Sequence, residues 1–331
     1  MEVEKNQIPS DSNNVRWESS ADTMTEQPLN EPVLGYSPGS PERNSIIQEI
    51  DRQMSETIEI PCIINGEEVY TGHTIPQVIP HNHGHILANV HLAGREEMES
   101  ACSAAVNAQR SWIEIGLEER CKIFEKCADL LAGDWRMRVN ASTMLNQSKT
   151  VFQAEIDSAC ELIDFWRFNC HYARGFHDDF QPLVSPEGVV NSTDIRPLEG
   201  FVLSITPFNF TSIAGNLPSA PAIVGCTSVW KPSRNSYYSN YYLMRLMMEA
   251  GLPPGVINFL PGSGAEITEV ALSNPNFAGL HFTGSTATFQ GLWQEIGLAL
   301  PKLNSYPRIV GETGGKDFVV AHPDCDRRGL V

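Results

Sequence analysis

A repeating pattern of apolar runs and amphipathic stretches begins near residue 200 and constrains the fold more than any other feature of this chain. The first run, FVLSITP over 201–207, is continuously apolar, which is typical of a strand buried on both faces of a parallel sheet. The pattern continues with a helix-like stretch at 216–225, a strand at 227–232, a helix at 240–251, a strand at 255–262, a helix at 265–274 and a strand at 278–284. This alternation predicts an α/β fold with a doubly wound parallel sheet.

The part of the chain before this repeat has a different, mostly helical pattern. Residues 41–56 begin with a proline and place several isoleucines on one face, which predicts a helix. Two β-rich runs surround Asn65-Gly66, the dipeptide most typical of a tight hairpin. Residues 95–179 are helical in pattern, and Gly133 is expected to end one of these helices.

Two further segments carry weaker signals. Residues 1–28 are polar and acidic and lack periodicity, so we expect a disordered leader. The alternation in VVNSTDIRP, residues 189–197, predicts an edge strand. The N-terminus has neither the apolar core of a signal peptide nor the arginine-rich composition of a mitochondrial transit peptide.

The charge of the chain limits its partners. The formal net charge of -17 repels phosphate backbones and anionic lipid, so we expect no nucleic acid and no membrane surface as partner.

A membrane span and a disulfide framework are not expected either. Residues 201–230 contain no charged side chain, but Pro207, Pro218 and Pro221 argue against a spanning helix. The eight cysteines form no CxxC pair and are expected to be reduced thiols. A small-molecule enzyme is the class that remains.

Polar residues follow the predicted strands, where ligands of doubly wound sheets bind. Asn209 offers uncharged N–H donors for a developing negative charge, although an asparagine there also fits a helix cap. Lys231 places an ammonium where a ribose or phosphate can lie, although a solvated lysine is the ordinary alternative. Glu312, before Gly-Gly on a predicted tight turn, fits a general base or a surface glutamate.

Glycine-rich turns and histidines complete the candidates. The FTGST turn at 282–286 and, more weakly, Gly264 in LPGSGAE present bare backbone N–H groups for an anion or pyrophosphate. His81, His83 and His85 alternate, so a metal site is conceivable, but a polar turn before a strand explains them equally well. We expect no metal.

These motifs together, in this order and spacing, resemble the NAD(P)-dependent aldehyde dehydrogenase superfamily. Longer segments resemble its Δ1-pyrroline-5-carboxylate dehydrogenase branch, which oxidises L-glutamate γ-semialdehyde in proline breakdown. The resemblance runs from about residue 29 to about 326 and is carried by NEPVLGYSPGSPER, NHGHILA, KTVFQAEIDSACELIDFWRFN, LEGFVLSITPFNFTSIAGNLPSAPA and HFTGSTATFQGLW.

The resemblance implies a role for each of these positions. Asn209 is then the oxyanion donor and Glu312 the base for thioester hydrolysis, with Phe210 near the aldehyde substrate. NAD is the cofactor, and the residues implied to bind it are Thr206, Phe208, Lys231, Ser233, Gly264, Gly284, Ser285 and Thr286. Arg234, next to the ribose-binding turn, departs from the usual pattern and leaves the choice between NAD and NADP open.

The resemblance also implies the organisation of the chain. We expect a leader over 1–28, an N-terminal helical part of the NAD-binding domain over 29–184, an oligomerisation-type strand over 185–199, a Rossmann-like NAD-binding core over 200–312 and the start of a catalytic domain over 313–331. The fold expected is thus the Rossmann-like sheet of the aldehyde dehydrogenase type, with most of the catalytic domain missing. Homodimers or higher oligomers and the mitochondrial matrix follow from the resemblance; without a visible address the cytoplasm is the alternative.

The nucleophile is the main departure from the family pattern. In the family a Gly-Gln-x-Cys segment lies beyond the E-x-G-G-K motif, and this sequence contains no such segment. Cys226 and Cys325 lie in other contexts and are expected to be ordinary thiols. Three functions stay open: part of an ordinary dehydrogenase, an inactive form that binds dinucleotide or a full-length partner, and an interaction protein that reuses the fold.

Overall fold

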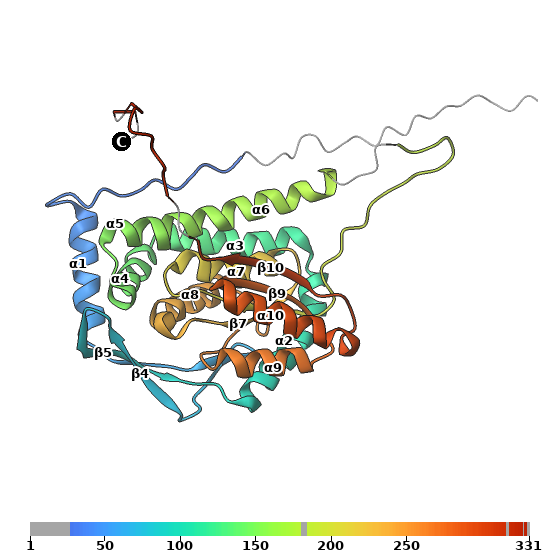
Figure 1. Ribbon diagram of the computed structural model, residues 1–331, viewed down its shortest axis with the longest axis horizontal. Helices are drawn as coiled ribbons and strands as arrows, with labels where there is room; N and C mark the ends of the chain where they lie inside the picture. Colours follow the sequence, from blue (N-terminus) through green and yellow to red (C-terminus); the bar gives the residue numbers. More distant parts are fainter. Residues whose placement is uncertain (1–26, 180–183, 316–317, 327, 330–331) are drawn as a thin grey trace, which may run out of the picture.

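A seven-stranded sheet with helices on both faces forms the centre of the chain (Figure 1). The computed structural model describes residues 27–179, 184–315, 318–326 and 328–329. Neighbouring parallel strands stand in the order β10-β9-β6-β7-β8. Their bounds are β6 Phe201–Ile205, β7 Thr227–Lys231, β8 Ile257–Phe259, β9 Phe277–Gly284 and β10 Arg308–Thr313. The predicted doubly wound parallel sheet is confirmed.

The winding of the chain creates a switch point between β6 and β9. From β6 the chain moves outward through β7 to β8, and it then returns to the other side of β6 to form β9 and β10. The first two crossovers, α7 (Thr211–Ile223) and α8 (Tyr237–Ala250), pack in one apolar core, while α9 (Gly264–Ser273) and α10 (Thr286–Ala299) pack in another on the opposite face. Loops that leave the carboxyl ends of β6 and β9 therefore diverge and leave room for a ligand.

Further helices thicken both layers. Helix α2 joins the core of α9 and α10, and the others pack on the side of α7 and α8 (Figure 1). Their bounds are α1 Pro41–Met54, α2 Arg95–Glu114, α3 Gly116–Ala132, α4 Arg136–Gln147, α5 Val151–Ala154, the π-helical turn η1 Glu155–Cys160 and α6 Glu161–Asp179, with short 3-10 turns at η2 Arg234–Ser236 and η3 Leu300–Lys302. Helices were expected at 41–56 and 95–179 and are confirmed, with Gly133 as a C-cap.

The predicted hairpin at Asn65-Gly66 is also confirmed. Strands β2 (Cys62–Ile64) and β3 (Glu67–Val69) pair antiparallel, and both turn residues have positive φ, 53° and 79°. The hairpin extends the main sheet beyond β8. Residues 29–184 are nevertheless less helical than expected, because β1 Ile58–Ile60, β4 Thr74–Ile79 and β5 Asn82–His91 form a separate three-stranded sheet there.

Two prolines inside α7, Pro218 and Pro221, remove backbone donors, and at Pro221 side chains replace the missing donor. Pro221 has no N–H for the Leu217 carbonyl four residues earlier. That carbonyl instead accepts hydrogen bonds from Ser204 Oγ at 3.1 Å and from His281 Nδ1 at 2.9 Å. Since a carbonyl only accepts, Nδ1 carries the proton of His281, and burial lowers the pKa of this ring. The hydrogen bonds tie α7 to both β6 and β9.

A buried polar cluster attaches the first described residues to the helical layer. We call it the Glu155 cluster; it consists of Glu31, Tyr36, Arg136, Asn140 and Glu155. The fully buried carboxylate of Glu155 accepts hydrogen bonds from the Tyr36 hydroxyl at 2.6 Å and from Asn140 Nδ2 at 2.7 Å, and it pairs with Arg136. Burial alone acts to raise the pKa of Glu155, but these donors outweigh it and the pKa is lowered. Glu155 is the first residue of the π-helical turn η1, so this turn positions the carboxylate at the centre of the cluster.

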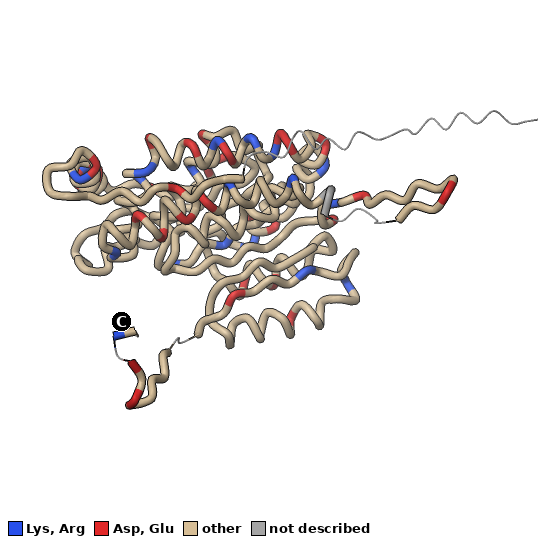
Figure 2. The backbone as a smooth tube through the Cα atoms, turned by 90° about the horizontal axis from the view of Figure 1, so that it is seen from above, with Lys and Arg blue, Asp and Glu red and all other residues tan. Residues whose placement is uncertain are grey.

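The segment before β6 differs from the prediction. Residues 184–199 contain no strand in the single chain and extend away from the body of the fold (Figure 1, Figure 2). An extended segment counts as a strand only when its backbone pairs with a neighbour, and within the described chain it has none. Pairing with a second subunit stays a prediction. The predicted leader lies, apart from residues 27 and 28, outside the described residues.

Candidate functional site

Four loops meet at the carboxyl edge of the parallel strands. Ile205 at the end of β6 lies in register with Lys231 of β7 and with Phe282 of β9, and Glu312 of β10 lies in register with Thr283. The residues that follow these positions therefore gather at one edge. We call this group the strand-end site; its members are Thr206, Phe208, Asn209, Phe210, Lys231, Ser233, Gly264, Gly284, Ser285, Thr286 and Glu312.

The loop after β6 is held firmly up to Thr206 and is then exposed. Thr206 is buried; its N–H donates to the Lys231 carbonyl at 3.2 Å, and its hydroxyl accepts from Trp230 Nε1 at 3.0 Å. Phe208 is 56% exposed and Asn209 is exposed as well. The hydrogen bonds thus fix the loop as far as Thr206, and the side chains of Phe208 and Asn209 beyond it are exposed to solvent.

Asn209 does not cap the following helix. The N-cap of α7 is Phe210, and no side-chain hydrogen bond caps this helix. Among the residues that the structure describes, the Asn209 amide has no hydrogen-bond partner. The capping alternative is therefore wrong, and the two N–H donors of Asn209 are free for a ligand.

Lys231 is the most unusual charge at this edge. Burial lowers the pKa of its ammonium, and no hydrogen bond or ion pair to another described side chain compensates. The ammonium lies at the start of α9, 3.9 Å from where a Cβ on Gly264 would stand. A helix N-terminus is itself positive, so an ammonium beside it favours an oxygen-rich or anionic ligand between them.

The N-terminus of α10 follows the same pattern after β9. Ser285 is the N-cap and its hydroxyl accepts from the Thr288 N–H at 3.2 Å, while Ser285 and Thr286 are exposed. A Cβ on Gly284 would stand 2.7 Å from the Phe282 ring, so a larger residue there requires that the ring move. The first N–H groups of α10 therefore face an open surface, as a pyrophosphate seat requires.

Glu312 occupies a different element from the one expected. It was predicted on a tight turn, but it lies within β10, one residue before the end of that strand. The turn comes just after it, where the Gly314 N–H donates to the Gly284 carbonyl at 3.1 Å. Glu312 is exposed, so its carboxylate is open to water.

Three charged residues of this site were not singled out from the sequence. Lys149, before α5, lies 4.3 Å from the centre of the Phe210 ring and pairs with Asp157 at 2.5 Å. Glu161, at the start of α6, accepts from Ser212 Oγ in the first turn of α7 at 2.6 Å. The available signal was the spacing of four between Asp157 and Glu161, which places both on one helical face.

Glu161 lies in a negative environment. Burial is the main cause that raises its pKa, and the charges of Asp157 and Glu312 raise it further, while the Ser212 hydrogen bond and Lys149 oppose this. Glu161 and Glu312 therefore lie close enough to interact. Two carboxylates of different environment therefore belong to this region, and the charge of Lys149 opposes part of their effect on the Glu161 pKa.

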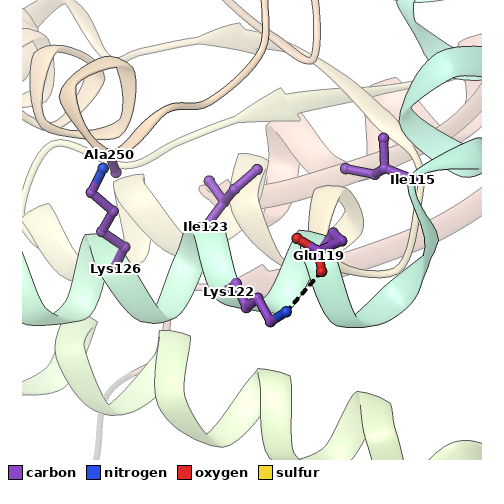
Figure 3. A pocket seen from close by; sticks show the side chains of 6 residues that line it. All are labelled: Ile115, Glu119, Lys122, Ile123, Lys126 and Ala250. Carbon is purple, nitrogen blue, oxygen red and sulfur yellow. Dashed lines mark hydrogen bonds and ion pairs between the residues drawn. The ribbon is translucent and has the colours of Figure 1, made fainter.

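Two pockets of the described structure lie away from this site. A shallow one of about 340 Å³ lies along α3 and is lined by Ile115, Glu119, Lys122, Ile123, Lys126 and Ala250 (Figure 3). Lys122 turns to Glu119, 2.7 Å away, so neither charge is free to bind a ligand (Figure 3). A second, lined by Trp135, Arg138, Arg245, Met248 and Glu249, lies between α4 and α8. Neither contains a residue of the strand-end site.

Metal and membrane sites were also considered. His81 contacts Ser148 Oγ at 2.8 Å, and within the described ranges no group of three or more His, Cys, Asp or Glu side chains is placed to hold a metal ion. No helix in the described part of the chain is long and apolar enough to span a bilayer.

The chain belongs to the aldehyde dehydrogenase family, whose family model matches residues 69–331. It is 48% identical over 303 residues to the Delta-1-pyrroline-5-carboxylate dehydrogenase of Agaricus bisporus, covering 91% of this chain and 55% of that protein. The mitochondrial Delta-1-pyrroline-5-carboxylate dehydrogenase of Homo sapiens is 41% identical over 317 residues, with 96% of this chain and 55% of that protein covered.

Solved structures agree with this assignment. The Mycobacterium tuberculosis Delta-pyrroline-5-carboxylate dehydrogenase bound with NAD matches with a TM-score of 0.88 and 50% identity over 92% of this chain and 56% of that chain. The Thermus 1-pyrroline-5-carboxylate dehydrogenase with bound NAD matches with a TM-score of 0.80 and 27% identity over 88% and 56%. The chain spans about half the length of the curated relatives it matches.

Proposed function

We propose that this chain provides the NAD-binding part of a Δ1-pyrroline-5-carboxylate dehydrogenase, which oxidises L-glutamate γ-semialdehyde to L-glutamate in proline breakdown. One observation carries the proposal: the partly buried Lys231 ammonium, which has no partner among the described residues, lies beside the N-terminus of α9, at the edge of a sheet that matches an NAD-bound relative. The ribose and phosphate oxygens of a dinucleotide would supply the hydrogen-bond acceptors that this ammonium lacks.

The residues present fit NAD. Lys231 and Ser233 hold the adenosine ribose, and the N–H groups at Gly284, Ser285 and Thr286 receive the pyrophosphate. Gly264 leaves space beside Lys231, since a Cβ there would stand 3.8 Å from Lys231 Cε. Thr206 and the exposed ring of Phe208 border the nicotinamide end. Arg234 is exposed next to Ser233, so a 2′-phosphate also has a cation within the same turn.

The chemistry of the chain's own residues follows from their positions. NAD, when bound, accepts a hydride from the substrate carbon. Asn209 donates its amide N–H groups to the aldehyde oxygen as negative charge develops there. Glu312, open to solvent, takes a proton from the water that releases the acid product. The Phe210 ring, held by Lys149, borders the aldehyde.

A binding role without catalysis is the second candidate. The family's mechanism needs a cysteine thiolate. Seven of the eight cysteines are buried within the fold, and Cys325 belongs to a tail that leaves the body of the molecule (Figure 1, Figure 2). Burial raises the pKa of Cys226. These observations support dinucleotide binding, alone or beside a full-length partner, as the activity of the chain as given.

Compartment and assembly follow the relatives. Several relatives, including the human protein, are named mitochondrial, and we propose the mitochondrial matrix for this chain as well. Residues 184–199, which extend from the fold without a strand partner, are the segment that we expect to pair with a second subunit. Size-exclusion chromatography with light scattering measures the assembly.

Calorimetry tests the proposed function directly. We expect NAD to bind the purified chain with one site, and NADP to bind more weakly unless Arg234 accepts its phosphate. We expect no NADH absorbance when glutamate semialdehyde is added to the chain with NAD. Folded, monodisperse protein that binds neither dinucleotide would overturn the binding proposal. Steady NADH formation would instead overturn the expectation that none of the eight cysteines acts as the nucleophile toward the aldehyde.

A further inference from the structure

Two buried cysteines on neighbouring helices are in mutual contact. Cys121 of α3 and Cys170 of α6 are both 0% exposed. The sulfur of Cys121 lies 3.9 Å from the carbonyl oxygen of Cys170, and the sulfur of Cys170 lies 3.7 Å from the carbonyl oxygen of Cys121. Each thiol thus reaches the backbone of the other residue. A disulfide requires this close approach of two backbones.

No other pair of described cysteines shares this geometry. Cys127 lies on the same helix as Cys121 and is also 0% exposed, but no thiol contacts it. Cys160 contacts Arg136 and Glu155, and Cys62 contacts the His91 carbonyl. The contact between Cys121 and Cys170 is therefore specific to the crossing of α3 and α6.

An ion-pair network covers this crossing from the solvent side. Arg174, one turn after Cys170, pairs with Glu118 at 2.9 Å and with Glu125 at 2.5 Å. Glu118 and Glu125 lie one turn before and one turn after Cys121 on α3. The guanidinium bridge spans the two thiols, and its side chain is 18% exposed. Because both thiols are fully buried, the proposed reaction requires a local movement at this crossing.

We propose that Cys121 and Cys170 are a modification site at which a hydroperoxide forms a reversible disulfide between α3 and α6. The thiolate of Cys121 attacks the peroxide O–O bond, giving a sulfenic acid and hydroxide, which takes up a proton to become water. The sulfur of Cys170 then attacks the sulfenic sulfur and a second water leaves. Two thiols are oxidised and one peroxide is reduced, so atoms and electrons balance.

The charges around the pair favour this order of steps. The contact with the Cys170 thiol is the main cause that lowers the pKa of Cys121, and the charge of Arg174 adds to it, while burial and the charges of Glu125 and Glu118 act in the opposite direction. The same contact raises the pKa of Cys170. We therefore assign the first attack to Cys121 and the resolving step to Cys170.

The cross-link joins two helices that bear on the strand-end site. Helix α6 begins at Glu161, whose carboxylate contacts the first turn of α7. Helix α3 packs against α6, α7 and α8. A covalent link between α3 and α6 therefore restricts the layer that supports Asn209 and Phe210, without changing any residue of the site.

The test is oxidation of the native protein. The native chain is treated with hydrogen peroxide, the peroxide is removed, and the protein is then unfolded in the presence of N-ethylmaleimide, which blocks every remaining free thiol, before digestion with trypsin. We expect the peptide 168–174 to be linked to the fragment that holds Cys121, and dithiothreitol to release it. Thermal unfolding of the oxidised protein shifts to a higher temperature because the link constrains the unfolded chain.

Variants separate this site from general oxidation. Cys121→Ala and Cys170→Ala each abolish the linked peptide, whereas Cys127→Ala, the matched control on the same helix, leaves it unchanged. Alkylated Cys121 and Cys170 in native wild-type protein after peroxide treatment, or Cys170 linked to a different cysteine, would overturn the proposal.

Discussion

The Glu155 cluster and the strand-end site both hold polar groups, but they differ in how many of these groups have partners. In the cluster every charge is paired: Glu155 accepts from Tyr36, Asn140 and the Leu34 N–H, and Arg136 pairs with Glu31 at 2.5 Å. At the strand-end site Asn209 and Lys231 have no partner among the described residues. Buried polar groups that have hydrogen-bond or ion-pair partners stabilise the fold. Polar groups without partners at an exposed edge are available to bind a ligand.

This difference gives opposite expectations for substitutions. A change in the Glu155 cluster leaves a buried charge unpaired and lowers the free energy of unfolding. A change at the strand-end site removes a group that already lacks a partner, so it lowers affinity or activity and spares stability. Variants from both regions test whether the division holds.

Arg136→Met has the largest expected effect. It leaves the fully buried Glu155 without its cation, and removing one partner of a buried ion pair costs about 3–5 kcal/mol of the free energy of unfolding. Urea unfolding measures this loss. Arg110→Met, which removes an exposed pair with Glu114, is the control and changes the transition little. An Arg136→Met protein as stable as wild type would end the view that the cluster is structural.

The same cluster predicts acid sensitivity. The pKa of Glu155 is lower in the folded than in the unfolded state, so its contribution is fully present above the ordinary glutamate pKa. It is lost as the pH falls through the lowered value. Unfolding measured from neutral to acid pH therefore shows a steeper loss of stability in wild type than in a Glu155→Gln variant.

Lys231→Met is the matching change at the strand-end site. It removes the charge-assisted contact that we propose Lys231 makes to NAD, so we expect affinity to fall by about 10- to 100-fold in calorimetry. Stability stays the same or rises slightly, because an uncompensated buried ammonium is removed. Wild-type affinity also falls with rising pH earlier than for an ordinary lysine, since burial lowers the Lys231 pKa. Lys302→Met, on the exposed turn η3, is the control; equal affinities of both variants would contradict the assignment.

Ser285→Ala tests a residue that both stabilises a helix and belongs to the proposed binding site. Its hydroxyl caps α10 and its backbone lies where the pyrophosphate is proposed. We expect a loss of about 1 kcal/mol in the free energy of unfolding from the missing cap. NAD affinity falls only modestly, because the backbone N–H groups stay in place. Ser285→Asp restores the cap but repels the pyrophosphate, so a Ser285→Asp protein that binds NAD normally argues against this seat.

Asn209→Ala has the smallest expected effect on the fold. The amide has no partner among the described residues, so the free energy of unfolding changes by less than about 0.5 kcal/mol. NAD affinity also stays near the wild-type value, because Asn209 is assigned to the aldehyde oxygen. A measurable loss of stability in urea would show that Asn209 has a structural role. It would contradict the expectation that changes at the strand-end site leave stability intact.

Local patterns predicted most of the sheet and the strand-end residues. The run FVLSITP and its successors are unambiguous because strands buried on both faces have no polar alternation. The order of these strands places Asn209, Lys231 and Gly284 at one edge without any knowledge of side-chain contacts. The hairpin at Asn65-Gly66 was predictable for a similar reason, since its turn is determined by two residues.

Contacts between distant segments were not predictable in this way. Glu161 reaches Ser212 only because α6 packs on α7, and Lys149 reaches Phe210 across 61 residues of sequence. The position of Glu312 within β10 depends on pairing with β9, which extends the strand into what looked like a turn. Residues 189–197 have the pattern of a strand but no neighbour in the single chain.

The Glu155 cluster also sets an order of events during synthesis. Tyr36 leaves the ribosome 119 residues before Glu155, its hydrogen-bond partner, and Asn30 precedes its partner Asp164 by 134 residues. The contacts of the earliest described residues with η1 and α6 therefore form only after these elements have emerged, whereas their contacts with Arg136 and Asn140 of α4 can form sooner. Docking onto η1 and α6 closes a long loop and is among the later steps. A nascent chain stalled before residue 150 leaves this N-terminal segment open to proteases and chaperones, however well its first helices have formed.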